Sequence, residues 1–152
     1  MVRSEARGSA PRRLAWLVVP IALVLPACGG DSESTVDVTL QEFAVIPASS
    51  SVEAGSITFD ATNDGPDDLH ELVVIRTDLD PTALPTDENG AVDENGEGIE
   101  VIGEIEEFPV GEAESATFDL ETGDYVLICN IYDEEEQEAH YAEGMRTAFE
   151  VT

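Results

Sequence analysis

The 152-residue sequence contains no lysine, and four of its six arginines lie within the first 28 positions. Beyond that point only Arg76 and Arg146 oppose 33 acidic residues, which leaves a net charge of −31 on the rest of the chain. A surface of this charge repels nucleic acid and anionic lipid, and so excludes nucleic-acid binding. The composition favours cationic partners, salt-rich surroundings, or both.

Long hydrophobic runs are also scarce. The run at residues 14–25 is too short to cross a bilayer, which needs roughly 20 apolar residues. Because arginines precede it and Pro26-Ala27-Cys28 follows, residues 1–28 are predicted to be an export signal. The small residue before Cys28 resembles a bacterial lipobox, in which Cys28 would carry a lipid; an ordinary secretory signal is the alternative. We expect an exported protein, attached to the outer face of the cytoplasmic membrane only through this lipid.

The polar residues 29–35 predict a tether, and residues 36–152 are enough for one domain. No stretch of this domain shows a helical period with caps. Several runs instead alternate apolar and polar residues between glycine-containing turns, as strands with one buried face do. The pattern predicts an all-β fold, an antiparallel β-sandwich. The alternating runs lie at Val36–Leu40, Ile57–Phe59, Phe118–Leu120 and Phe149–Val151.

Residues 77–107 interrupt this pattern and predict one long acidic loop inserted between strands. The segment contains two prolines and two copies of Asp-Glu-Asn-Gly, at 87–90 and 93–96. The spacing of its acids does not match a twelve-residue calcium loop. Near its end, residues 101–105 could form a short strand or helix that packs the segment back. A loop of this length in a compact domain is either functional or mobile.

Beyond the first 28 residues the chain keeps two histidines, one cysteine and one methionine: His70, His140, Cys129 and Met145. These are ligand types for a soft metal, and a thiolate with a thioether favours copper. Strand parity places His70 on the same face as the apolar residues two and four positions later, so its side chain is predicted to point inward. Two strand ends and the loop between them can bring Cys129, His140 and Met145 together, and a neighbouring strand can supply His70.

Each of the four residues, taken alone, also fits plain packing in a core. Jointly they favour a metal site, because an unpaired thiol in an exported domain is unusual unless something protects it. Zinc would accept two histidines and a cysteine, but the methionine adds nothing for zinc.

The segment from Tyr125 to Met145, together with a histidine in an early strand, resembles the cupredoxins, the blue-copper family that includes plastocyanin and azurin. The spacing His140-x4-Met145 matches that of plastocyanins. The resemblance covers essentially the whole predicted domain and implies a Greek-key sandwich of about seven or eight strands. It further implies one type 1 copper, with His70, Cys129 and His140 in a plane and Met145 as a weak axial ligand.

The resemblance also suggests residues around the metal. The backbone amide of Glu71 is a candidate donor to the Cys129 sulfur, and Asn130 is a candidate hydrogen-bonding neighbour of the site. One departure is the separation of Cys129 from His140 by ten residues, where better-known members have only a few; sulfocyanin-like surface cupredoxins are the nearest resemblance. In this fold the second histidine usually lies nearest to solvent, so we expect His140, beside the acidic residues 133–138, to be the electron port.

The ligand inventory limits the function. A binuclear copper centre needs a second cysteine, and copper oxidases and nitrite reductases need further histidines. No nucleophile motif or glycine-rich phosphate loop is present either. We therefore expect a monomeric electron carrier and not an enzyme, with a redox partner such as a cytochrome or oxidase that docks through a basic surface. The alternatives are a lipoprotein that buffers or delivers copper, and a binding module that keeps only the fold.

Overall fold

The computed structural model describes residues 32–152. The export signal, Cys28 and residues 29–31 lie outside this range, so the lipid anchor remains a prediction. Among the described residues, no helix is long and apolar enough to cross a membrane.

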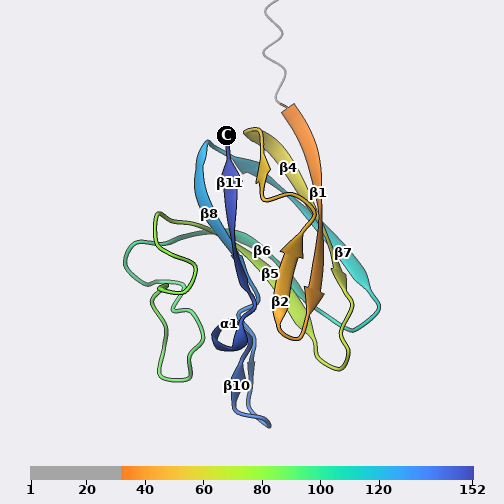
Figure 1. Ribbon diagram of the computed structural model, residues 1–152, viewed down its shortest axis with the longest axis vertical. Coiled ribbons are helices and arrows are strands. Elements are labelled where there is room, and N and C mark those ends of the chain that lie inside the picture. Colours follow the sequence, from red (N-terminus) through yellow and green to blue (C-terminus); the bar gives the residue numbers. More distant parts are fainter. Residues whose placement is uncertain (1–31) are drawn as a thin grey trace, which may run out of the picture.

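Two β-sheets form a sandwich, as the alternating pattern predicts (Figure 1). The first sheet has the strand order β2-β1-β4-β7, and its strands β1 and β4 are parallel, so the expectation of an entirely antiparallel sandwich was wrong. The second sheet has the order β3-β11-β8-β5-β6 and is called the ligand sheet below. The strands are β1 (Ser32–Gln41), β2 (Ala44–Pro47), β3 (Ser51–Val52), β4 (Gly55–Asn63), β5 (His70–Arg76), β6 (Glu100–Phe108), β7 (Ala113–Leu120), β8 (Gly123–Ile128) and β11 (Arg146–Val151).

The main core lies between the two sheets. Alternate residues of each strand enter it, and Phe59 at its centre stacks edge-on against Phe149 with ring centroids 5.5 Å apart. Fully burying one such side chain stabilises the fold by roughly 1.5–3 kcal/mol. The core includes Val36, Val38, Leu40, Ile57, Phe59, Ala61, Leu72, Val74, Tyr125, Leu127, Phe149 and Val151.

Strand β1 begins earlier than the domain start expected from the sequence. Residues 32–35, expected to belong to a tether, pair in parallel with residues 55–58 of β4. The side chains of residues 33–35 are polar and lie outside the main core, so no apolar alternation marks this part of the strand. Backbone pairing, which leaves no trace in the sequence pattern, extends the strand here.

The irregular segment is shorter than the sequence suggests, because β6 begins at Glu100; residues 77–99 are called the outer layer below. This layer covers the outer face of the ligand sheet, where Leu84 and Val92 pack against β5 and β8. Both strands are therefore buried on two faces, which explains their nearly continuous apolar sequences. The second core contains Val73, Ile75, Leu84, Val92, Val126, Ile128 and Tyr141.

Candidate metal centre

The register of the ligand sheet brings three predicted ligands to the same end of its strands. Strand β5 begins at His70, β8 ends one residue before Cys129, and β11 begins one residue after Met145. Because β8 is antiparallel to both β5 and β11, the first residues of those strands meet the last residues of β8. His140 begins the one-turn helix α1 (His140–Glu143), which lies between β8 and β11 in the chain.

Backbone hydrogen bonds join the ligand-bearing segments directly. The Cys129 N–H donates to the Met145 carbonyl at 3.0 Å, and the Met145 N–H donates to the His140 carbonyl at 2.9 Å. The His140 N–H in turn donates to the Ile131 carbonyl at 2.9 Å. The relative positions of these segments are therefore fixed by the main chain.

The ten residues between Cys129 and His140 form a small hairpin, which returns the chain to the site. Strands β9 (Tyr132–Asp133) and β10 (Glu138–Ala139) pair antiparallel. At the turn, the Asp133 Oδ1 accepts hydrogen bonds from the N–H groups of Glu135 and Glu136, at 2.6 and 3.0 Å. The long interval is thus compatible with a shared site for both ligands.

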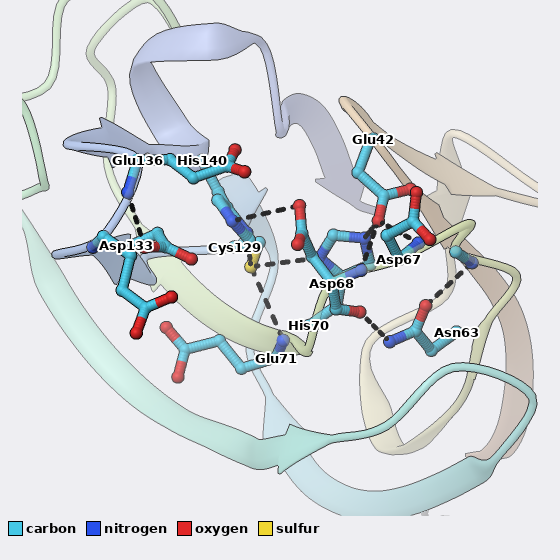
Figure 2. Close-up of polar contacts among 12 residues, drawn as sticks. Glu42, Asn63, Asp67, Asp68, His70, Glu71, Cys129, Asp133, Glu136 and His140 are labelled. Atoms are coloured by element: carbon cyan, nitrogen blue, oxygen red, sulfur yellow. Dashed lines mark hydrogen bonds and ion pairs between the residues drawn. The ribbon is translucent and has the colours of Figure 1, made fainter.

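The side chains of His70, Cys129 and His140 converge in the interior (Figure 2). The Nδ1 atoms of His70 and His140 lie 3.9 and 3.4 Å from the Cys129 Sγ, and the three ligand atoms lie within 4.8 Å of one another. A metal about 2.0 Å from nitrogen and about 2.3 Å from sulfur, at trigonal to tetrahedral angles, requires separations of roughly 3.5–3.7 Å. The observed distances bracket that requirement, so the three side chains fit one metal ion.

Met145 is fully buried in the main core, next in the chain to β11. Its backbone contacts with Cys129 and His140 place it beside the other three predicted ligands. The donor set at this end of the sandwich is thus two imidazoles and one thiol, with an adjacent thioether.

Burial determines the protonation of the metal-free site. It raises the pKa of the Cys129 thiol to about 12, although the Glu71 N–H opposes this by donating to the Sγ at 3.5 Å. Burial also lowers the pKa values of His70 and His140. Near neutral pH the site holds a thiol and two neutral imidazoles, so binding a metal as a thiolate complex releases the thiol proton.

The predicted neighbours Glu71 and Asn130 connect the site to the outer layer. The Glu71 Oε1 accepts a hydrogen bond from the Asn130 N–H at 2.9 Å, and burial raises the pKa of Glu71 to about 7. The Asn130 side chain contacts no ligand atom. Its Oδ1 accepts from the Val92 N–H at 2.6 Å, while its Nδ2 donates to the Val92 carbonyl and the Glu94 Oε1, each at 3.1 Å.

Tyr141, which follows His140 in the chain, also contacts the outer layer, and Arg146, which follows Met145, contacts Tyr141. The Tyr141 hydroxyl donates to the Pro81 carbonyl at 2.8 Å and accepts from the Leu84 N–H at 3.2 Å. The Arg146 guanidinium lies 5.0 Å from the centre of the Tyr141 ring and donates to the Tyr141 carbonyl. Asn130 and Tyr141, which follow Cys129 and His140 in the sequence, therefore hydrogen-bond the outer layer to the segments that carry these ligands.

His140 was expected to lie nearest to solvent, and it is buried only slightly less than His70: its side chain is 2% exposed, against 0% for His70. Phe43 packs edge-on against the His140 ring, with centroids 5.5 Å apart, and Asp68 lies against its Nε2. An open pocket of about 380 Å³ nevertheless reaches His140; it is lined by Asp67, Asp68, Leu69, Ile131, Tyr132, Asp133, Glu134 and His140.

Sequence reasoning missed two carboxylates behind the imidazoles, Glu42 and Asp68. The Glu42 Oε1 lies 3.7 Å from the His70 Nε2, and the Asp68 Oδ2 lies 4.0 Å from the His140 Nε2 (Figure 2). Acids are so numerous in this chain that no sequence signal separates these two from the others.

The fold is shared with solved blue-copper structures, although no protein-family model and no curated protein match the chain. The reduced auracyanin from the photosynthetic bacterium Roseiflexus castenholzii is 21% identical, with a TM-score of 0.54 over 81% of this chain and 99% of that one. Auracyanin A, a "blue" copper protein from Chloroflexus aurantiacus, is 16% identical, with a TM-score of 0.53 over 80% of this chain and 100% of that one. Rusticyanin from Thiobacillus ferrooxidans is 16% identical, with a TM-score of 0.51 over 78% of this chain and 77% of that one. The chain therefore has the cupredoxin fold that its sequence resemblance implied.

Proposed function

We propose that the protein binds one copper ion through His70, Cys129, His140 and Met145 and carries single electrons between redox proteins outside the cytoplasmic membrane. The observation that carries this proposal is the convergence of two Nδ1 atoms and one Sγ at metal-binding separations. Thiolate and thioether suit Cu(I), whereas imidazole binds both copper states. The nine-strand sandwich holds these donors in place, so little rearrangement accompanies a change of oxidation state.

Burial of the donors favours an electron carrier over a copper-delivery protein. Cys129, His70, His140 and Met145 are each 2% exposed or less. Such a site offers no open position to a substrate and no ready path for transfer of the metal to another protein. We expect a soluble Cu(I) chelator to remove copper only over hours; removal within seconds would favour the buffering or delivery role.

The orientation of β1 supports a site directed away from the membrane if Cys28 carries a lipid. Strand β1 starts at Ser32, at the end of the molecule opposite α1 and β10 (Figure 1). Its ten residues span about 33 Å. An anchor at Cys28, separated from this strand by three residues, would hold the molecule at the membrane by the end remote from the metal centre. A partner would then have free access to the metal centre.

The pocket over His140 supports a partner with a basic docking surface. Its rim includes Asp67, Asp68, Asp133 and Glu134, and further acids follow in the β9–β10 turn. Negative charge at a docking site accelerates the encounter with a basic protein, and salt weakens this effect. The described face thus suits a cationic redox protein such as a basic cytochrome.

The proposal is tested with the copper-loaded protein and a basic cytochrome. We expect one copper per chain, reversible one-electron voltammetry, and a transfer rate that falls as salt is added. Changing Glu134, Glu135 and Glu136 to glutamine should lower the rate at low salt. The matched control changes three exposed acids of the first sheet, Asp60→Asn, Glu114→Gln and Asp119→Asn. Equal rates for both triple variants would contradict docking at this pocket, and irreversible voltammetry would contradict the carrier function.

A further inference from the structure

Each imidazole of the proposed copper site has a carboxylate behind it, on the side away from the sulfur (Figure 2). The Nδ1 atoms face the Cys129 Sγ, whereas the Nε2 atoms of His70 and His140 face Glu42 and Asp68. At 3.7 and 4.0 Å these contacts are longer than direct hydrogen bonds and act through charge. Each ring therefore has a sulfur near its Nδ1 and a carboxylate near its Nε2.

Main-chain groups hold the Glu42 carboxylate in place. Its Oε1 accepts hydrogen bonds from the N–H groups of Asp67 and Asp68, at 2.9 and 2.6 Å, and the side chain is 11% exposed. Two N–H donors on one oxygen favour the charged form of a carboxyl group. An ionised carboxylate is thus fixed next to His70.

Two buried polar atoms at this contact have no hydrogen-bond partner: the His70 Nε2 and the Glu42 Oε2. A buried polar group without a partner is destabilising, so such atoms call for an explanation. A proton on the Nε2 makes that nitrogen a donor facing a negatively charged acceptor. The same proton position leaves the Nδ1 with the lone pair that a metal requires.

Asp68 is positioned by a buried amide. The Asn63 Nδ2 donates to the carbonyls of Asp68 and Phe108, at 2.9 and 3.0 Å, and its Oδ1 accepts from the Gly65 N–H at 2.8 Å. Asn63 is fully buried. The loop that carries Asp68 is therefore held at both ends, by Asn63 and by the Glu42 carboxylate.

We propose that Glu42 and Asp68 are positioning residues of the copper site: they hold His70 and His140 with the proton on Nε2, and their charges favour Cu(II) over Cu(I). The inference rests on the proposed function. Histidine ligands of protein-bound metals commonly donate their second N–H to a carboxylate, which fixes the tautomer and makes the ligand more basic. Negative charge near the metal stabilises the more positive ion, most strongly where burial limits screening.

The tautomer is measured first, in the metal-free protein, by nitrogen-15 chemical shifts and long-range proton–nitrogen correlations of the two imidazoles. We expect both rings to carry their proton on Nε2 at neutral pH. A proton on Nδ1 of His70, or rapid exchange between tautomers in both rings, would overturn the positioning role. This measurement needs no copper, so it gives a result even if the proposed function fails.

The charge effect is measured as the reduction potential of the copper-loaded variants Glu42→Gln and Asp68→Asn. Glutamine and asparagine keep an oxygen acceptor at nearly the same place and remove the charge. For Glu42→Gln we expect the ratio of Cu(I) to Cu(II) at a given applied potential to rise about tenfold, which is a potential higher by about 59 mV. The expected change for Asp68→Asn is smaller, about threefold, because this side chain is 31% exposed.

Asp67→Asn is the matched control, since it removes the same charge from an exposed neighbour whose side chain does not contact either imidazole in the described structure. Shifts in Glu42→Gln and Asp68→Asn no larger than in this control would overturn the charge effect. If the unmodified protein shows a blue-copper spectrum and the shifts are absent, only the present inference fails. If the unmodified protein shows no blue-copper spectrum, the proposed function fails. The tautomer measurement in the metal-free protein then tests the positioning role of Glu42 and Asp68.

Discussion

The two sheets of the sandwich differ in what covers them. The first sheet faces the core on one side and solvent on the other, and β7 is exposed over most of its length. The ligand sheet is buried on both sides at β5 and β8, by the main core and by the outer layer. Every proposed copper ligand lies on or beside the ligand sheet.

This difference indicates separate roles. The first sheet supplies apolar surface to the core. Its hydrogen bonds to the loop that carries Asp68 include those of Asn63, the last residue of β4, and of Glu42, in the turn between β1 and β2. The ligand sheet carries the proposed ligands or the residues next to them, and the outer layer is hydrogen-bonded to Asn130 and Tyr141. Substitutions in the first sheet away from Glu42 and Asn63 should therefore change stability alone, whereas those between the ligand sheet and the outer layer should also change the copper spectrum.

The largest effect on stability is expected for Phe59→Ala in the first sheet. Removing this fully buried ring leaves a cavity and should cost about 3–5 kcal/mol of unfolding free energy. Denaturant unfolding of the metal-free protein measures the loss. The absorption maximum of the copper-loaded protein should stay at the same wavelength, and a shift would contradict the separation of roles. If Phe59→Ala does not fold, Phe59→Leu is measured in its place.

Asn130→Ala should combine a smaller loss of stability with a spectral change. It removes three side-chain hydrogen bonds to the outer layer next to Cys129, at an expected cost of about 1–3 kcal/mol. The copper absorption and hyperfine splitting should change because the sulfur is carried by the preceding residue. Asn89→Ala is the control, since that side chain donates only within an exposed turn, to Asp87 at 3.5 Å. Identical spectra for both variants would mean that the outer layer does not set the geometry.

Tyr141→Phe removes one hydroxyl that contacts two groups of the outer layer while keeping the ring. We expect a loss of about 1 kcal/mol and a small shift in the copper spectrum, because Tyr141 follows His140. Thermal unfolding and visible absorption measure the two effects. Unchanged stability would show that packing against the Tyr141 ring, and not its hydroxyl, holds the layer.

Thr58→Val is the corresponding hydroxyl deletion on the first sheet and should have the smallest effect. The Thr58 and Thr117 hydroxyls lie 2.7 Å apart on the exposed face. We expect a change within about 0.5 kcal/mol, as for most surface substitutions, and an identical spectrum. A spectral shift as large as that of Tyr141→Phe would remove the distinction between the two sheets.

Much of the fold was predictable because burial imposes alternation. The runs at 36–40, 57–59, 118–120 and 149–151 lie in strands β1, β4, β7 and β11, and the inward direction of His70 follows from the same parity. Features without an apolar pattern were not predictable: the polar start of β1 and the hairpin before His140. Residues 101–105, expected to form a short strand or helix, lie in the longer strand β6, which begins at Glu100.

The candidate site was predictable only for its rare residue types. Beyond the first 28 residues the chain has one cysteine, one methionine and two histidines, so few sets of metal ligands are possible. The register of β5, β8 and β11 explains why these residues converge. Glu42 and Asp68 could not be chosen from so many acids, because their role depends on loop conformations set by Asn63 and by main-chain N–H groups. The burial of His140 likewise depends on contacts distant in sequence, chiefly with Phe43.

The most direct test of the copper site is a titration of the purified protein with Cu(II), followed by visible absorption and electron paramagnetic resonance, with Cys129→Ser as the control. We expect an intense thiolate-to-copper absorption band and narrow hyperfine splitting at one copper per chain, both lost in the control. Colourless binding, or the same spectrum in the control, would contradict a blue-copper site at Cys129.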